Sequence, residues 1–201
     1  GATNTITGLA DAYLDSIPVI CITGQVPSPL IGSDAFQEAD VVGITRPCTK
    51  HNYLVKDINA VEQTVKEAIH IASTGRPGPV LIDIPKDVQF ANGTYIGPAK
   101  ADKGHYSPRV KGDMEKITEL VELIEKAKKP VIYSGGGVIN SGTAASMLLR
   151  EMAEETKFPV TSTLMGLGAY PASGDKWLGM LGMHGTYEAN MVMHGCDLMI
   201  N

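Results

Sequence analysis

Glycine clusters mark the places in this sequence where a ligand could approach the backbone. The run Gly135–Gly137 follows a predicted strand and precedes a predicted helix, an arrangement in which backbone N–H groups can reach a phosphate. A tight turn that needs positive φ explains the run equally well. The dinucleotide fingerprint requires glycine where Asn140 stands, and the next strand ends in Ser162 and Thr163 rather than in an acid. The sequence therefore disfavours an NAD-dependent oxidoreductase and leaves a phosphate site open.

Two basic side chains are set among small residues. In TGRPGPV, Arg76 stands between Gly75 and Pro77, where a guanidinium could bind a phosphate or carboxylate, although composition alone favours an ordinary surface arginine. In MLGMHGTYEAN, His184 follows Met183 and has glycines on both sides. A single histidine among apolar residues is usually structural, but these glycines also permit a flat ligand to approach, with methionine as a packing surface.

A third candidate stretch, IGSDAFQEAD, is predicted as a short helix capped by Asp34. It carries two carboxylates, Glu38 and Asp40, and next to them Phe36 and Gln37. We expect the acids to be solvated and Phe36 to lie in the core. Nothing in the pattern brings the two acids into one pocket, so the sequence does not predict paired acid–base catalysis.

Strands alternate with helices along the chain, which predicts an α/β fold with parallel sheets. Buried strands are expected over residues 17–24, 79–85, 130–134, 158–163 and 196–201. Helices are expected over residues 5–15, 34–41, 58–74, 113–128, 142–156 and 188–193. The helix over 113–128 should face inward through four apolar residues: Ile117, Leu120, Val121 and Ile124.

The pattern divides the chain into two units. Periodicity fails from about residue 90 to 108, where Gly, Pro, Lys and Ala dominate, as in an interdomain linker. We therefore predict one unit over residues 1–90, a linker over 91–111 and a second unit over 112–201. The first residues, GATN, look like the end of a turn, and the last strand stops where a loop should follow. We expect both ends to be truncations.

Bulk composition narrows the function classes. The net charge of −5 gives no support for nucleic acid or an anionic membrane as a partner, and no apolar run approaches the roughly 18 residues of a membrane span. Three widely spaced cysteines argue against a disulfide framework and fit a reducing cytoplasm. No metal-binding spacing of His or Cys is present, so no metal site is predicted from the residues.

Several stretches together resemble one enzyme family. The sequences SDAFQEAD, TKHNYLV, GRPGPVLIDIPKDVQ, TLMGLGAYP and LGMHGTYEAN are similar to the large, catalytic subunit of acetolactate synthase (acetohydroxyacid synthase), a thiamine diphosphate enzyme. GATN and GRPGPV occur throughout the thiamine diphosphate carboligases, whereas SDAFQEAD with TKHNYLV is specific to acetolactate synthase. The resemblance covers nearly the whole chain and is weakest across the linker.

The resemblance implies a fold and a cofactor for each unit. The first unit would be the C-terminal half of the domain that binds the pyrimidine ring of thiamine diphosphate, and the second a Rossmann-like central domain that holds FAD without net redox work. Both would be three-layer, parallel-sheet units. The residues that the resemblance assigns to FAD are Arg76, Gly136, Thr163, Leu164, Leu181, Gly182, Met183 and His184.

The resemblance also implies residues around thiamine diphosphate and the substrate. Gln37 and Ser16 would lie near thiamine diphosphate. Phe36 and Lys50 would line the substrate channel across a subunit interface, where Pro27 and Ala35 match positions at which herbicides bind. In this family, pyruvate is decarboxylated and its two-carbon unit is joined to a second 2-keto acid, giving acetolactate or acetohydroxybutyrate for isoleucine, valine and leucine synthesis.

The resemblance places the decisive catalytic groups outside these 201 residues. The family's glutamate would precede Gly1, and its Mg²⁺-diphosphate motif, Gly-Asp-Gly followed by Asn, would lie in a C-terminal domain. Gly112-Asp113 and Gly174-Asp175 lack the context of that motif. We therefore expect no catalytic residue and no metal ligand in this chain, and no activity from it alone.

The resemblance implies partners and leaves two alternatives. The parent would be a cytoplasmic homodimer or homotetramer with a small regulatory subunit. Another thiamine diphosphate carboligase, such as glyoxylate carboligase, is the nearest competitor. A non-enzymatic FAD-binding module is the alternative from a different functional class.

Overall fold

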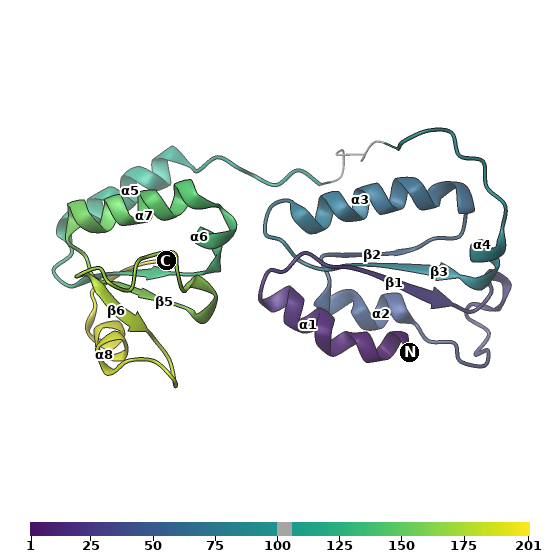
Figure 1. Cartoon of the computed structure of the whole chain (residues 1–201), viewed down its shortest axis with the longest axis horizontal. Coiled ribbons are helices and arrows are strands. Elements are labelled where there is room, and N and C mark those ends of the chain that lie inside the picture. The colour runs from purple at the N-terminus through teal and green to yellow at the C-terminus, as the bar shows by residue number, and fades with distance from the viewer. Residues whose placement is uncertain (100–105) are drawn as a thin grey trace. The chain divides into compact units, whose positions relative to one another are not determined.

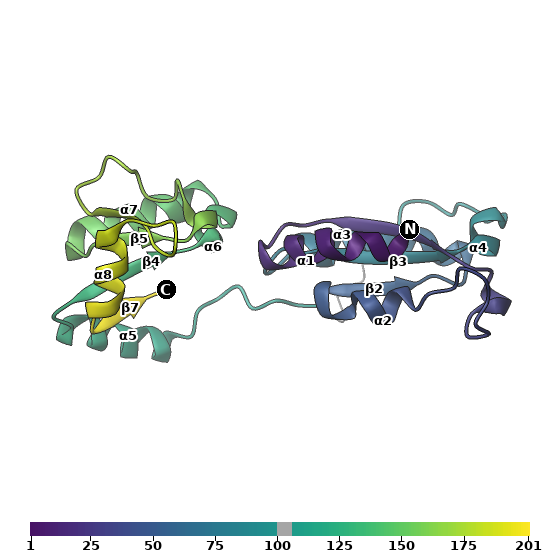
Figure 2. The same ribbon diagram turned by 90° about the horizontal axis from the view of Figure 1, so that it is seen from below.

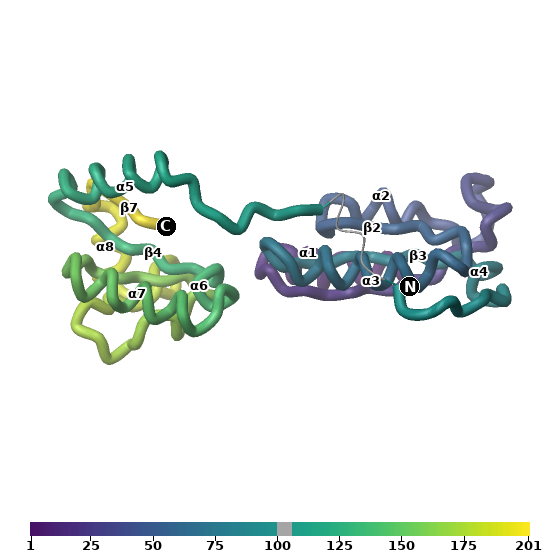
Figure 3. The backbone as a smooth tube through the Cα atoms, turned by 90° about the horizontal axis from the view of Figure 1, so that it is seen from above, coloured from purple at the N-terminus to yellow at the C-terminus, as the bar shows by residue number. Residues whose placement is uncertain are grey.

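A computed structural model describes residues 1–99 and 106–201 of the chain (Figure 1). The chain forms two compact units, Gly1–Val110 and Lys111–Asn201, and each is described by itself. Figure 3 traces the backbone through both units, each of which combines strands with helices. In the described residues, no helix is long and apolar enough to cross a membrane.

The first unit is built on a three-stranded parallel sheet in the order β1-β3-β2. Its strands are β1 (Ile20–Gln25), β2 (His51–Leu54) and β3 (Val80–Pro85). β3 is the central strand, and nearly all of its residues are buried because strands flank it and helices cover both of its faces. Ile20 pairs with Val80, and Gln25 at the end of β1 pairs with Pro85. The carboxyl ends of all three strands therefore lie at one edge of the sheet.

Helices cover both faces of this sheet, as Figures 1 and 2 show. α3 (Val61–Ser73) packs Ala68 and Ala72 against Val80 and Ile82 of β3. On the opposite face, α1 (Ile6–Leu14) and α2 (Val41–Thr45) pack against Leu81. The alternation follows from the period of two in a strand. Shorter elements complete the unit: η1 (Ala2–Thr5), η2 (Ser28–Leu30), η3 (Arg46–Cys48), η4 (Ile58–Ala60) and α4 (Lys86–Phe90).

The second unit is built on a four-stranded parallel sheet in the order β6-β5-β4-β7. Its strands are β4 (Pro130–Ser134), β5 (Val160–Ser162), β6 (Trp177–Met180) and β7 (Leu198–Ile200). The chain order runs from β4 through β5 to β6 and then returns to the other side of β4. The strand order thus reverses between β4 and β7, the position at which open α/β sheets commonly bind ligands beyond the carboxyl ends of their strands.

Helices again cover both faces of this sheet (Figure 1). α5 (Met114–Lys126) and α7 (Thr143–Thr156) lie on one side and α8 (Tyr187–Gly195) on the other, with α6 (Gly136–Asn140) and η5 (Leu164–Gly166) at the edge. The core joins Leu149 and Ala153 of α7 to Ile132 and Val160 of the sheet. The prediction of three-layer, parallel-sheet α/β units is confirmed.

The helix predicted over residues 34–41 is wrong. Residues 34–40 consist of turns and irregular backbone, and the helix starts only at Val41 with Asp40, not Asp34, as its cap. Asp34 and Gln37 both adopt a left-handed conformation, with φ of 58° and 62°, which an α-helix does not tolerate. The amide groups of Gly32 and Ala35 donate to the Glu38 carboxylate, which folds this stretch into a turn.

The structure differs from the sequence-based expectations in two further places. The short strands β2 and β6 went unpredicted because four residues of mixed polarity show neither alternation nor a continuous apolar run. The expected inward face of α5 is only half right, since Leu120 and Ile124 are half-buried whereas Ile117 and Val121 are exposed.

The segments on either side of residues 100–105 contact α3, its C-cap and the short helix η4 that precedes it. The amide of Thr94 donates to Asn59, and the amide of Ala99 donates to Glu62 at 2.8 Å. At the other end of α3, the Tyr106 hydroxyl donates to the carbonyl of Thr74 at 2.9 Å. The stretch predicted as a linker is thus attached to the first unit at both ends of this helix, and part of that prediction, residues 100–105, lies outside the described residues.

Candidate functional site

The carboxyl edge of the first sheet carries a cleft of about 430 Å³. It is open to the end of β1 and to the loop over residues 26–40, which we call the β1–α2 loop. Its lining residues are Gly1, Ala2, Thr3, Gly24, Gln25, Gln37, Glu38, Ala39 and Val41. The GATN start, the end of β1 and the FQEAD stretch are therefore brought to one place.

Carboxylates hold the β1–α2 loop at its beginning and in its middle. Asp87 on α4 accepts hydrogen bonds from the amide and hydroxyl of Ser28, at 2.8 and 3.2 Å. Glu38 accepts from the amides of Gly32 and Ala35. These backbone donors lower the pKa of both carboxyl groups. Both carboxylates therefore remain ionised at neutral pH and hold the loop in place by these hydrogen bonds.

A buried carboxylate holds the end of the same loop. Asp83, in β3, is 1% exposed and accepts from the Thr23 hydroxyl at 2.8 Å and from the Gln25 amide at 3.1 Å. Burial raises the pKa of Asp83, and the two hydrogen bonds oppose that shift. The Gln25 amide also donates to the carbonyl of Ala39 at 2.7 Å, while its oxygen accepts from Val26. Gln25 thus connects Asp83, in the core of the sheet, to Ala39, which lines the cleft.

Four of the predicted site residues lie on the β1–α2 loop: Pro27, Ala35, Phe36 and Gln37. Gln37 lines the cleft in its left-handed conformation, a state that persists only where the surroundings enforce it. Phe36 is 89% exposed, so the expectation that it lies in the core is wrong. The loop instead presents an aromatic ring to the outside.

Three other predicted site residues, Ser16, Lys50 and Arg76, lie at the amino edge of the same sheet. Arg76 donates from Nε to the Ser16 hydroxyl at 2.8 Å and from its terminal nitrogen to the Leu14 carbonyl at 3.0 Å. The Lys50 ammonium donates to the carbonyls of Ile71 and Thr74 at the end of α3. Both cations therefore satisfy helix C-terminal carbonyls.

The two groups of predicted residues are separated by the length of β1. Six strand residues span about 20 Å. Ser16 precedes β1 and Gln37 follows it, so one ligand on one chain does not contact both. Lys50 is likewise remote from Phe36. The structure does not bring together the two halves of the predicted thiamine and channel sites.

Sequence reasoning missed several residues at the carboxyl edge. Lys86 begins α4 directly after β3 and is exposed there, unlike Lys50. The hydrogen-bonded set of Thr23, Gln25 and Asp83 was also missed. A signal for this set was available, because an aspartate inside the buried run PVLIDIP needs a polar partner.

The carboxyl edge of the second sheet gathers the residues predicted for FAD in that unit. They occupy the loops after three neighbouring strands: Gly136 after β4, Thr163 and Leu164 after β5, and Leu181, Gly182, Met183 and His184 after β6. Apolar side chains are presented here, with Leu164 67% and Met183 91% exposed. The loop after β6 is fixed because Asn190 bonds both the amide and the carbonyl of Gly182, at 2.9 and 3.0 Å.

Close backbone packing shapes this edge. A side chain on Gly166 would collide with the carbonyl oxygen of Ser134, and one on Gly136 would approach Met165 to 3.1 Å. None of Gly135–Gly137 has positive φ, so the explanation of that run as a turn requiring positive φ is wrong. The close contact at Gly136 means that a side chain there would displace Met165 by a few tenths of an ångström.

Two buried hydroxyls at this edge have no hydrogen-bond partner among the residues that the structure describes. Ser134 and Ser162 are paired across β4 and β5 at the last positions of both strands. Buried polar atoms are normally satisfied, so such a pair is unusual. An apolar surface with close backbone approach suits a flat ring system such as a flavin.

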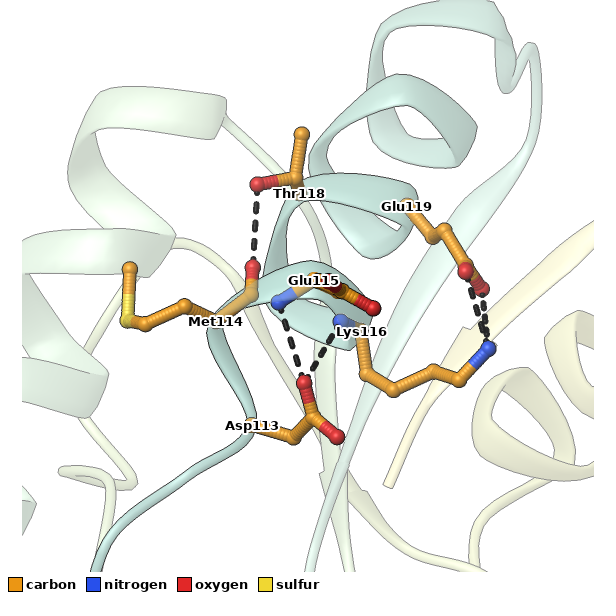
Figure 4. Close-up of polar contacts among 6 residues, drawn as sticks. All are labelled: Asp113, Met114, Glu115, Lys116, Thr118 and Glu119. Atoms are coloured by element: carbon orange, nitrogen blue, oxygen red, sulfur yellow. Dashed lines mark hydrogen bonds and ion pairs between the residues drawn. The ribbon is translucent and has the colours of Figure 1, made fainter.

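Asp113 and Asp175, which follow glycines as in a magnesium motif, do not form a metal site. Asp113 caps α5 by accepting from the amides of Glu115 and Lys116, at 3.0 and 3.4 Å, while Lys116 pairs with Glu119 (Figure 4). Across residues 1–99 and 106–201, no group of three His, Cys, Asp or Glu side chains could hold a metal ion.

Family models match both units. Residues 1–44 match the N-terminal thiamine pyrophosphate-binding domain of thiamine pyrophosphate enzymes, and residues 117–201 match their central domain. The chain is 51% identical to the acetolactate synthase large subunit of Buchnera aphidicola (subsp. Schizaphis graminum), over 99% of this chain and 35% of the relative.

Two other relatives give the same result. Identity is 49% to the acetolactate synthase isozyme 3 large subunit of Escherichia coli K12, over 99% of this chain and 35% of that protein. It is 52% to the large subunit of Corynebacterium glutamicum, over 100% of this chain and 32% of that protein. The chain thus spans about a third of the length of these relatives. It belongs to the thiamine pyrophosphate enzymes, and its sequence groups with their acetolactate synthase large subunits.

Proposed function

We propose that this chain supplies part of an acetolactate synthase that joins pyruvate, after its decarboxylation, to a second 2-keto acid. The observation that carries the proposal is an identity of about half that extends over essentially the whole chain. The products would be acetolactate or acetohydroxybutyrate, precursors of branched-chain amino acids. Glyoxylate carboligase is not favoured, since the relatives named above are all acetolactate synthases.

The cleft at the carboxyl edge of the first sheet is the proposed contact with thiamine diphosphate. When bound, this cofactor supplies the carbanion chemistry that decarboxylates a 2-keto acid. Gln37 would contact it from the β1–α2 loop, which is held rigidly by Glu38 and Asp87. Ser16 lies at the opposite edge, where its role in this chain is to orient Arg76. Mg²⁺ would be held by the family's Gly-Asp-Gly motif, which these 201 residues do not contain.

The carboxyl edge of the second sheet is the proposed FAD surface. Leu164 and Met183 would pack on the ring system, and the backbone at Gly136 and Gly182 would allow its close approach. Thr163, Leu181 and His184 complete that surface. The resemblance also assigns Arg76 of the first unit to FAD; its guanidinium uses two of its five N–H donors on Ser16 and Leu14, which leaves the others for cofactor oxygens. FAD would be structural in this reaction.

The outer face of the β1–α2 loop is the proposed wall of the substrate channel. Pro27, Ala35 and Phe36 would form it, and Lys86 is better placed than Lys50 to attract a keto-acid carboxylate there. An exposed phenylalanine on a rigid loop suits a subunit interface, in a homodimer or homotetramer with a small regulatory subunit. Three free cysteines fit a cytoplasmic location.

A segment exchange tests the proposal. The matching segment of the E. coli isozyme 3 large subunit is replaced by this chain, and acetolactate formation from pyruvate is measured. We expect turnover, together with restored growth of a strain that lacks acetolactate synthase. A folded hybrid that forms no acetolactate, or that prefers glyoxylate, would contradict the proposal.

Point variants of the hybrid assign the residues. Gln37→Ala should weaken thiamine diphosphate binding about tenfold, as loss of a well-placed hydrogen bond to a charged ligand does. Lys86→Gln should raise KM for pyruvate, whereas Lys50→Gln should lower stability without changing KM. Lys116→Gln is the matched surface control, because Lys116 pairs only with the exposed Glu119.

A further inference from the structure

Every hydrogen-bonding group of the Gln25 side chain is used. One amide hydrogen is directed to Asp83 and the other to the carbonyl of Ala39, while the amide oxygen accepts from Val26 at 2.9 Å. The side chain therefore has no free donor with which to bind a ligand. Gln25 nevertheless lines the cleft. Its contribution to the site is to fix other groups.

The anchor of this side chain is the core of the sheet. Asp83 belongs to the central strand β3 and is buried against the α1–α2 face, where Leu81 also packs. The Thr23 hydroxyl occupies its second oxygen. A buried carboxylate with two directional partners is a stiff reference point, because each partner that moves leaves a polar group unsatisfied.

The far end of the link is the last part of the β1–α2 loop. Gln25 bonds the carbonyl of Ala39, which also accepts from the amide of Val41 at the start of α2. Gln37, in its left-handed conformation, lies two residues before Ala39. Asp87 and Glu38 hold the earlier part of the loop, but only Gln25 ties this last part to the sheet among the described hydrogen bonds.

We propose that Gln25, held by Asp83 and Thr23, is a positioning residue that fixes Gln37 and the cleft wall for the bound cofactor. The link runs from the buried carboxylate through the glutamine amide to the Ala39 carbonyl. It rests on the proposed function only in naming thiamine diphosphate as the molecule in the cleft. Control of the loop by Gln25 is independent of that identity.

The link can be cut in two ways in the complete 201-residue chain. Gln25→Met keeps the approximate length of the side chain and removes the bonds to Asp83 and Ala39, together with the local bond from Val26. The double change Gln25→Glu with Asp83→Asn reverses donor and acceptor between the two positions. It keeps one negative charge and the bond between positions 25 and 83, but removes the bond from position 25 to the Ala39 carbonyl, which keeps only its donor at Val41. The matched control is Gln89→Met, because Gln89 at the same edge donates to the Ile84 carbonyl and not to the loop.

Hydrogen–deuterium exchange of peptides over residues 26–41 gives the first readout. We expect about tenfold faster exchange in Gln25→Met and in the double variant, corresponding to loss of one well-made hydrogen bond to the loop. The double variant should have a melting temperature close to that of the unmodified chain. The control Gln89→Met should exchange at the same rate as the unmodified chain. Loop protection restored by the double variant, or loss of folding in both Gln25 variants, would overturn the proposal.

Titration calorimetry with thiamine diphosphate and Mg²⁺ gives the second readout. Both Gln25 variants should bind at least about tenfold more weakly than the unmodified chain, and Gln89→Met should bind equally well. Faster loop exchange with unchanged affinity would overturn the positioning role. If the unmodified chain binds no thiamine diphosphate while the exchange result holds, the assignment of the cleft fails and the control of the loop by Gln25 stands.

Discussion

In the two units, different interactions fix the backbone at the carboxyl edge of the sheet. In the first unit, side-chain carboxylates hold the β1–α2 loop: Asp87 at its start, Glu38 in its middle, and Asp83 through Gln25 at its end. In the second unit, the backbone itself is packed too closely for side chains, as at Gly166 against the Ser134 carbonyl. The same edge of the same type of sheet is therefore fixed by charge in one case and by steric fit in the other.

This difference predicts different sensitivities. A loop fixed by carboxylates tolerates added volume but responds to loss of charge or to acid. An edge fixed by backbone packing responds to a single added methyl group and is insensitive to pH. The first unit places a polar, hydrogen-bonded wall beside its cleft. The second presents apolar side chains such as Met183 and leaves two buried hydroxyls unpaired.

The largest effect is expected for Gly166→Ala in the second unit. The added Cβ would collide with the Ser134 carbonyl and approach Gly135, so the backbone must shift. We expect the free energy of unfolding of this unit to fall by about 3 kcal/mol. Trp177 is the single tryptophan of the chain, and its fluorescence in a urea titration reports the second unit alone.

Gly137→Ala is the matched control for this steric effect. Its Cβ would meet nothing within 4 Å, and the residue lies in α6. Replacing a helical glycine by alanine should leave stability unchanged or raise it by up to about 1 kcal/mol. Equal destabilisation by the two variants would contradict the contrast between the units, because volume at Gly166 would then not be the cause.

Asp83→Ala should give the next largest effect, in the first unit. It removes the acceptor for Thr23 and Gln25 and leaves two donors unsatisfied, at a cost of about 2 kcal/mol. Far-UV circular dichroism should show an earlier transition, while the Trp177 transition stays in place. Asp11→Ala, on the exposed side of α1, should change neither. A shift of the Trp177 transition in Asp83→Ala would show that the units do not respond separately.

Much of the architecture followed from periodicity alone. The apolar runs at β1, β3 and β4 and the amphipathic pattern of α3 each reflect one dominant hydrophobic signal, and each was placed correctly along the chain. The expectation that the first run is a buried strand is wrong, because β1 lies at the edge of its sheet and Ile22 is exposed. The helix over 34–41 failed because its outcome depends on left-handed residues and a carboxylate that binds backbone amides. No window of hydrophobicity contains those interactions.

The candidate sites were predictable in part for a similar reason. The residues predicted for FAD in the second unit follow neighbouring parallel strands, so topology alone brings them together. Ser16 and Gln37 stand 21 positions apart, and only the direction of β1 reveals that they lie at opposite edges. The set around Asp83 depends on register between β1 and β3, which pairs Thr23 with Asp83. Register of that kind is a tertiary property.

A smaller, stabilising effect is expected for Ser134→Ala and Ser162→Ala. Each variant removes a buried hydroxyl that has no partner, so each should raise the free energy of unfolding by about 1 kcal/mol. Thr161→Val is the matched comparison, because the Thr161 hydroxyl donates to the Gly179 carbonyl at 2.8 Å and its loss should destabilise by about the same amount. Trp177 fluorescence measures all three. Destabilisation by the serine variants would mean that the hydroxyls are satisfied after all, as a bridging water would do.

Acid provides the subtlest test of the comparison, because it should loosen only the loop that carboxylates hold. Glu38 and Asp87 have pKa values lowered from ordinary values of 4.5 and 3.8, so each contributes stability that is present above those values and lost as pH falls through its lowered pKa. Asp83 acts in the opposite sense: its raised pKa means that the folded state binds the proton more readily, so its contribution to stability increases as pH falls from that raised value.

Exchange over residues 26–41, corrected for intrinsic rate, should therefore rise below about pH 4, while residues 164–168 show no such change. Glu38→Gln should abolish most of the pH response at the middle of the loop, whereas Asp83→Asn should leave it in place. Equal acid sensitivity at both edges would show that charge does not distinguish them.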